Sequence, residues 1–217
     1  MSEQKRITFR QKNATKCPIC SFEFNREELL SGGGRLIAGK LTDELRRNYE
    51  ESKKWGKIIP LVYVITVCPN CFYAAYPKDF LTLLSHEIEI IRNATASRKN
   101  AIIKFFGNQD FNNDRNIVLG AASYMLSVDC YTNRNKKIAP TFKNALSSIR
   151  AAWLFKDLGE LYPQKNFKKI SMFFYKKAFN FYQKVLDLIQ TGGEPTEAAG
   201  NMGPDTDKNW GYDGILY

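Results

Sequence analysis

The motif Cys17-Pro18-Ile19-Cys20 returns after 47 intervening residues as Cys68-Pro69-Asn70-Cys71. Two residues between paired cysteines let the chain turn so that both sulfurs point at one centre, and two such pairs complete a tetrahedral shell of four thiolates. Proline after the first cysteine presets φ for the turn. Paired C-x-x-C motifs are typical of a metal site. The sequence therefore predicts one metal ion bound by Cys17, Cys20, Cys68 and Cys71.

The residues around each pair favour β-hairpins. Residues 22–24 alternate between apolar and polar after the first pair, and a β-rich run at 58–67 leads into the second. We expect each pair at the tip of a hairpin, as in a zinc ribbon or a rubredoxin. Glycine often follows the second cysteine of such a tip, whereas Ser21 and Phe72 occupy those positions here.

Zn²⁺ in a structural role is the cofactor that this motif favours, because four thiolates leave no open position for water. One alternative is iron in a rubredoxin-like centre. Another is that one of the pairs acts as a redox dithiol.

The composition is typical of a globular protein: 44% of the 217 residues are hydrophobic and 25% are charged. No run approaches the roughly 20 apolar residues of a membrane span. Residues 1–12 are polar and charged, without the apolar core of a secretory signal. We expect a cytoplasmic protein with no membrane span.

The charge is unevenly distributed. The formal net charge is +10, and four thiolates with one Zn²⁺ would bring it to about +8. Residues 81–190 hold 17 basic and 8 acidic residues, a net of +9, whereas residues 191–217 hold 1 against 5, a net of −4.

The apolar period changes from two to about 3.6 residues after position 78, which indicates helices. Five are predicted, at 78–97, 98–106, 113–132, 141–161 and 166–190. The predicted fold class is α+β, mainly α. A small zinc-ribbon-like β head with an inserted helix near 42–45 spans residues 1–77, a helical-hairpin body spans 78–190, and an acidic tail rich in Gly and Pro spans 191–217.

The last two predicted helices carry a repeat-like pattern. Residues 155–162 read Phe-x-x-Leu-Gly-x-x-Tyr, which resembles the first helix of a tetratricopeptide repeat with Phe for the usual Trp. Ser171, Tyr175 and Ala178 continue at the spacing of the repeat, and Gln183 replaces its closing proline. The pattern predicts one repeat-like helical hairpin.

The chain as a whole resembles an uncharacterised bacterial family, the domain of unknown function 2225. The resemblance is carried by the two C-P-x-C pairs, by residues 34–39 and by Lys78-Asp79-Phe80, and residues 202–214 are similar to its spirochaete-type members. It implies a zinc-ribbon-like head followed by helices that resemble tetratricopeptide repeats, and a metal role for the four cysteines. It implies no activity.

The remaining motifs do not combine into an active site. Residues 34–40 resemble a phosphate-binding loop but lack Ser or Thr after Lys40. His86 is the only histidine, and Cys130 lies in an apolar predicted helix, where we expect it to act as a small buried hydrophobe. Residues 205–213 alternate oxygen-bearing side chains without the glycine and glutamate of an EF-hand. We therefore identify no catalytic residue and no further cofactor site.

Six lysines in and directly before the last predicted helix form a candidate basic surface: Lys165, Lys168, Lys169, Lys176, Lys177 and Lys184. On a helical wheel the aromatic residues fall on the opposite side, which favours a solvated lysine face over a stacking platform for bases. We expect a zinc-binding protein with a helical surface for a protein partner. The alternative is a nucleic-acid-binding zinc-ribbon protein that uses the basic helices to attract phosphate.

Overall fold

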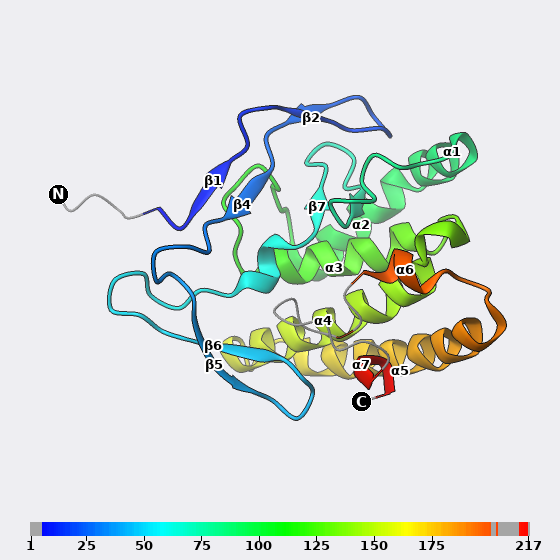
Figure 1. The fold of residues 1–217 in the computed structure, drawn as a ribbon. Helices are drawn as coiled ribbons and strands as arrows, with labels where there is room; N and C mark the ends of the chain where they lie inside the picture. Colours follow the sequence, from blue (N-terminus) through cyan, green and yellow to red (C-terminus); the bar gives the residue numbers. More distant parts are fainter. Residues whose placement is uncertain (1–5, 201–202, 204–212, 217) are drawn as a thin grey trace.

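The computed structural model describes residues 6–200, 203 and 213–216 (Figure 1). Within these residues, four two-stranded antiparallel sheets lie beside a larger group of helices, so the predicted α+β, mainly helical class is confirmed. The helices are α1 (Ser85–Asn93), α2 (Thr95–Phe106), α3 (Ile117–Tyr131), α4 (Pro140–Leu161), α5 (Phe167–Thr191), α6 (Thr196–Ala199), α7 (Asp213–Leu216) and the 3-10 helices η1 (Pro60–Tyr63) and η2 (Lys136–Ile138). The paired strands are β1 (Thr8–Arg10) with β4 (Glu27–Leu29), β2 (Thr15–Lys16) with β3 (Glu23–Phe24), β5 (Ile37–Leu41) with β6 (Arg47–Glu50), and β7 (Thr66–Val67) with β8 (Ala74–Ala75).

All five predicted helices exist, and their ends are shifted. The largest shift is at α1, which begins at Ser85 rather than at residue 78. Asp79 turns into the interior instead, where its carboxylate accepts a hydrogen bond from the Tyr131 hydroxyl at 2.5 Å and pairs with the Lys143 ammonium at 2.5 Å. The helix then starts where the Glu87 carboxylate accepts the backbone N–H of Leu84 at 2.8 Å.

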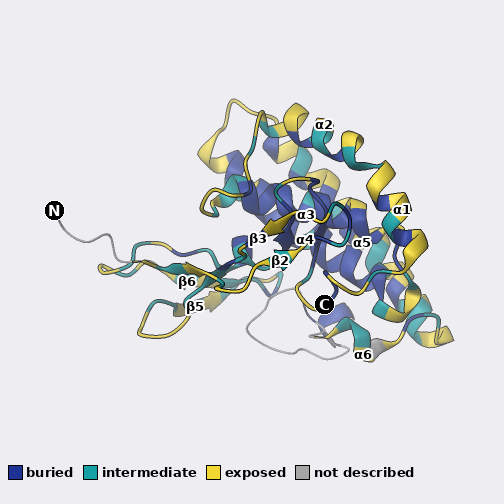
Figure 2. Cartoon of the chain, turned by 90° about the horizontal axis from the view of Figure 1, so that it is seen from above, coloured by how far each residue is buried: buried dark blue, intermediate teal, exposed yellow. Residues whose placement is uncertain are grey.

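The centre of the core is formed by α3 and α4, which are the darkest helices in Figure 2. Trp153, Phe155 and Leu126 are fully buried there. The same apolar cluster includes Ile19 and Val67 from the cysteine-bearing hairpins. The hairpins and the helices therefore share one core, and the predicted boundaries at residues 78 and 191 stay a prediction.

The helices α4 and α5 approach closely at small residues. A Cβ atom added to Gly159 would lie 2.6 Å from Cγ of Lys168, and the Ser171 hydroxyl donates to the carbonyl of Ala152 at 2.8 Å. Phe155 stacks on Phe174 with ring centroids 5.4 Å apart. Small residues thus occur where the repeat-like pattern needs them, while the assignment to a tetratricopeptide repeat stays a prediction.

The prediction of a helix near residues 42–45 is wrong, because this segment is the turn between β5 and β6. The Thr42 hydroxyl accepts the backbone N–H groups of Glu44 at 3.2 Å and Arg46 at 3.1 Å, and Leu45 adopts a left-handed φ of 59°. Threonine therefore stabilises a turn here instead of a helix start. Its side chain is compatible with either structure, and the pairing of β5 with β6 decides between them.

The β-rich run at 58–67 is also only partly a strand. Pro60 begins η1, and Leu61 and Val62 are buried. A Cβ atom added to Gly120 of α3 would lie 2.6 Å from Cγ1 of Val62, so η1 packs directly on that helix. Only Thr66–Val67 of the run pairs as a strand.

The alternating pattern of residues 205–213 lies outside the described residues, apart from the backbone of Asp213 at the start of α7. Among the described helices, none has both the length and the apolar character that crossing a membrane requires.

Candidate metal centre

Each cysteine pair lies at the tip of a short antiparallel hairpin, as predicted. The first knuckle, residues 17–22, connects β2 with β3, and the second, residues 68–73, connects β7 with β8. In the first, the N–H of Ser21 donates to the carbonyl of Cys17 at 2.9 Å and the N–H of Cys17 donates to that of Phe22 at 2.9 Å. The two corresponding bonds of the second knuckle are also 2.9 Å long. The two knuckles therefore have the same backbone hydrogen bonds.

The residues after the second cysteines explain how the knuckles form without glycine. Ser21 has a φ of 62° and Phe72 a φ of 58°, the left-handed conformation for which glycine is usual. Such a conformation costs an ordinary residue roughly 1–2 kcal/mol. Phe72 offsets this cost by packing its ring edge-on against Phe111, with centroids 5.1 Å apart.

The four sulfurs form one compact cluster, with all ligand atoms within 4.8 Å of one another. The Sγ atoms of Cys17 and Cys71 are 3.6 Å apart, as are those of Cys20 and Cys68. A tetrahedron with metal–sulfur bonds of about 2.3 Å has edges of about 3.8 Å. The donor set and its spacing therefore fit a four-coordinate thiophilic ion. The two 3.6 Å separations both join one knuckle to the other, so the four cysteines constitute one site rather than two independent dithiols.

The site is largely shielded from solvent. Cys17, Cys68 and Cys71 are buried and Cys20 is half-buried. Hydrogen bonds from Cys68 and Cys71 lower the pKa of the Cys17 thiol to about 4, while the hydrogen bond to Cys17 raises the pKa of Cys68 and of Cys71. Neighbouring thiolates repel one another, so ionisation of one thiol disfavours ionisation of the next. A divalent ion removes that conflict by replacing the protons.

Two arginines hold the knuckles against the helices. The Arg92 side chain on α1 donates to the carbonyl of Ile19 at 3.0 Å. Arg98 on α2 is 3% exposed and donates to the carbonyls of Ile91 at 2.6 Å and Cys71 at 3.3 Å. The sequence analysis missed both residues, since an arginine that will be buried has no distinguishing pattern in a basic helix.

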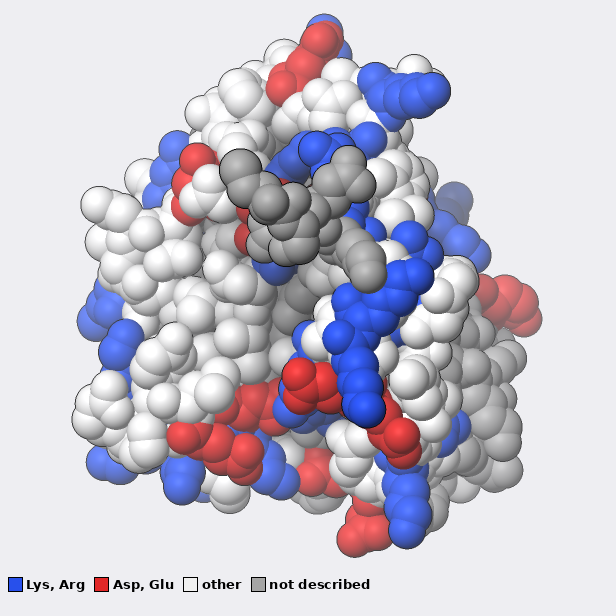
Figure 3. Space-filling model, turned by 90° about the vertical axis from the view of Figure 1, so that its left-hand side faces the viewer, with Lys and Arg blue, Asp and Glu red and all other residues white. Residues whose placement is uncertain are grey.

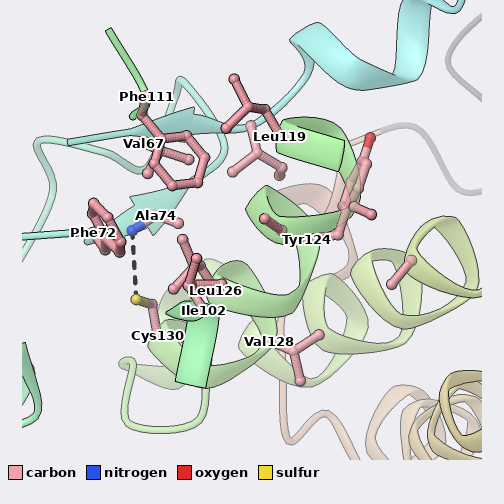
Figure 4. Close-up of a cluster of buried hydrophobic side chains, with 14 of the residues drawn as sticks. Val67, Phe72, Ala74, Ile102, Phe111, Leu119, Tyr124, Leu126, Val128 and Cys130 are labelled. Atoms are coloured by element: carbon pink, nitrogen blue, oxygen red, sulfur yellow. Dashed lines mark hydrogen bonds between the residues drawn. The ribbon is translucent and has the colours of Figure 1, made fainter. Parts of the chain in front are cut away.

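The other candidate residues lie outside the cluster. Cys130 is buried in α3, and its sulfur accepts the N–H of Ala74 at 3.4 Å (Figure 4). Burial raises the pKa of the Cys130 thiol to about 11, so it stays protonated at neutral pH. His86 is exposed in the first turn of α1. Residues 37–40 of the phosphate-loop-like stretch lie in β5, whose backbone pairs with β6 instead of forming a cradle.

Five of the six candidate lysines lie on α5 and Lys165 precedes it, and the expectation for the aromatic residues of α5 is wrong in part. Five of the six lysines are exposed and Lys177 is half-buried. Phe173 is 55% exposed and Phe179 is 62% exposed, so aromatic rings do lie among the lysines. The Lys177 ammonium lies 5.6 Å from the centroid of the Phe173 ring. The helical wheel considered the apolar stripe alone and missed these two rings.

A further polar group that the sequence analysis missed holds the β5–β6 turn on the helices. The Glu44 carboxylate accepts the indole N–H of Trp153 and, at 2.7 Å, the hydroxyl of Tyr175. Beside it, Arg46 donates to both carboxylate oxygens of Asp157, at 3.0 and 2.6 Å. These contacts join positions more than a hundred residues apart, so no local pattern could reveal them.

Comparison with known proteins identifies the family. A family model described as an uncharacterized protein conserved in bacteria, the domain of unknown function 2225, matches residues 11–201. The chain belongs to this family. An uncharacterized protein of Borreliella burgdorferi is 42% identical over 213 residues, which cover 98% of this chain and 76% of that protein. The resemblance seen in the sequence, including its spirochaete-type members, is therefore confirmed. No solved structure matches the chain significantly.

Proposed function

We propose that this protein is a cytoplasmic zinc-binding adaptor, in which a four-cysteine zinc site has a structural role and the helical body binds a protein partner. The observation that carries the metal proposal is the convergence of four sulfurs from two hairpins, with 3.6 Å between the closest atoms across the knuckles. Four thiolates fill a tetrahedral shell, so a bound zinc ion has no open position for a substrate. A bound zinc ion would cross-link the two knuckles. Arg92 holds the first knuckle on α1, and Arg98 holds the second on α2.

The proposed zinc is structural because the strands of the two hairpins are too short to hold the knuckles in shape by their own pairing. Each hairpin has only two residues per strand, and hairpins of this size are not stable by themselves. Metal binding to such elements supplies folding free energy directly.

The test is metal analysis combined with cysteine substitution. We expect one zinc ion per chain in protein purified without added metal, retention of that zinc by Cys130→Ala, and its loss from Cys68→Ser. Cys130→Ala is the matched control because it removes a buried sulfur outside the cluster. Iron in place of zinc would support the rubredoxin-like alternative. Metal-free protein with an unchanged unfolding temperature in the presence of a chelator would refute the structural-metal proposal.

The partner-binding proposal is supported by exposed apolar side chains on α5. Met172, Phe173 and Phe179 are each more than half exposed. Phe173 lies beside the buried Phe174 and the half-buried Ile170, and apolar surface of this kind is typical of interaction sites.

The exposed rings among the lysines also favour a second candidate, nucleic-acid binding, since bases stack on exposed aromatic side chains. On the face shown in Figure 3, by contrast, acidic side chains interrupt the basic ones. Binding of a single-stranded oligonucleotide that weakens steeply with salt would support this candidate. Absence of binding at low ionic strength would exclude it.

A further inference from the structure

A groove of about 470 Å³ lies between α2, α3 and α5. Its floor is apolar: Val128 and Phe174 are buried, and Met125 and Ile170 are half-buried. A groove of this volume and with this apolar lining can receive several apolar side chains of a partner.

Two aromatic rings form the walls of this groove and remain exposed. Phe105 on α2 is 41% exposed and Phe173 on α5 is 55% exposed. Exposed rings beside an apolar floor are the arrangement in which a docked side chain removes the most apolar surface from water.

The rim of the groove is positively charged on its α5 side. Lys169 and Lys177 line the groove, and Asp129 is the acidic residue among those that line it. Lys177 is eight positions after Lys169, so the two lysines lie about 12 Å apart along α5. Carboxylates two turns apart on a helix docked alongside have nearly the same spacing. Charge complementarity therefore selects a partner with acidic flanks.

The contacts of Phe173 favour a helix over a nucleic acid in this groove. The Lys177 ammonium lies 5.6 Å from the Phe173 centroid, and the rings of Phe173 and Phe174 form a T-shaped pair with an interplanar angle of 80°. A stacking base would have to displace Lys177, whereas aliphatic side chains can enter beside the ring. The described tail does not occupy the groove, because Ile215 of α7 packs with Phe142 and Val185.

We infer that this groove binds an acidic amphipathic helix of a protein partner. Apolar side chains of that helix, spaced one turn apart, enter between Phe105 and Phe173, and its carboxylates meet Lys169 and Lys177. The inference rests on the proposed function of the helical body as an interaction surface, and it names the partner chemistry.

The test is selection of binding peptides from a random library displayed on the full-length, metal-loaded protein. We expect the enriched peptides to have apolar residues at helical spacing and a net negative charge. Phe173→Ser should weaken their binding about tenfold, as loss of a central contact does. Lys169→Glu combined with Lys177→Glu should reverse the selection toward basic peptides, a change of preference that misfolding cannot produce. Lys184→Glu, on the same helix and outside the groove, is the matched control and should leave the selection unchanged.

Four results would overturn the inference. One is enrichment of peptides without an acidic bias, or no enrichment. Another is a single-stranded oligouridine that binds more tightly than the selected peptides and competes with them for the site at Phe173. The third is a dimer in solution that Phe173→Ser dissociates, which would make a second copy of this chain the occupant. Acidic peptides that depend on Phe179 and not on Phe173 would refute the groove while leaving the interaction surface in place.

Discussion

Replacing Gly120 by alanine adds one methyl group where α3 meets η1. The added Cβ atom would lie 2.6 Å from Cγ1, 2.8 Å from Cβ and 3.0 Å from Cα of Val62. Val62 is buried, and the carbonyl of its neighbour Leu61 accepts the Tyr124 hydroxyl at 2.9 Å. Neither the side chain nor the backbone of η1 can move away without breaking these contacts.

Two effects of opposite sign determine how much Gly120→Ala changes the free energy of unfolding. Alanine in place of glycine within a helix stabilises by about 1 kcal/mol. Overpacking a filled core costs about 1–3 kcal/mol, and a contact with backbone atoms favours the upper part of that range. We therefore expect Gly120→Ala to lower the free energy of unfolding by about 1–2 kcal/mol, and Tm by roughly 2–8 °C for a chain of this size.

Gly159→Ala is the matched control, since its added Cβ would lie 2.6 Å from Cγ of the exposed Lys168 and 3.1 Å from its backbone nitrogen. The Cγ atom of a lysine can rotate away, which leaves the 3.1 Å contact with the backbone nitrogen, so Gly159→Ala should lose less stability than Gly120→Ala, by about 1 kcal/mol. Urea denaturation followed by tryptophan fluorescence measures both variants. Equal stability of the two would refute the argument, because they share the gain in helix propensity and differ in what the methyl group meets.

Three other changes test separate parts of the structure. Glu44→Gln removes the charge that accepts the Trp153 indole, so we expect about 1 kcal/mol lower stability and a shift in tryptophan emission; an unchanged spectrum would contradict this. Arg98→Met leaves the carbonyl of Cys71 without a donor and should cost about 2–4 kcal/mol in urea denaturation, whereas an unchanged midpoint would show that the arginine is not needed. Burial and the Glu27 charge raise the pKa of Tyr63 to about 12, above the value of about 10 in the unfolded chain. The stability that this shift supplies is complete below pH 10 and is lost between pH 10 and 12. Tyr63→Phe should therefore reduce the loss of stability over that pH range. Tyrosinate absorbance that shows Tyr63 ionising near pH 10 would refute the shift.

The cluster of four cysteines could be predicted from local sequence because its geometry is local. A C-P-x-C motif specifies its own turn, and two such turns require only that the chain bring them together. The two non-glycine residues that follow the motifs do not prevent the turn, because Phe72 packs against Phe111 and stays in the left-handed conformation. The helices were predictable for a similar reason, since the apolar period along each helix reflects the one face that it buries.

The errors occurred where distant contacts outweigh local preference. Thr42 is compatible with a helix start or a turn, and the contacts of Glu44 with α4 and α5 hold it as a turn. Residues 58–67 have high β propensity, yet packing of Val62 against Gly120 makes part of the run a 3-10 helix. Propensities of about 1 kcal/mol or less cannot oppose burial of several apolar side chains.

The sequence by itself therefore determined which four cysteines cluster, the family and the order of the helices, because each depends on motifs or periods within a few turns of chain. Only the tertiary structure decided which arginines support the knuckles and which rings of α5 remain exposed beside the lysines. Both depend on neighbours distant in the sequence. The groove between α2, α3 and α5 is the clearest case, since its floor and its rim come from three helices whose juxtaposition no single segment encodes.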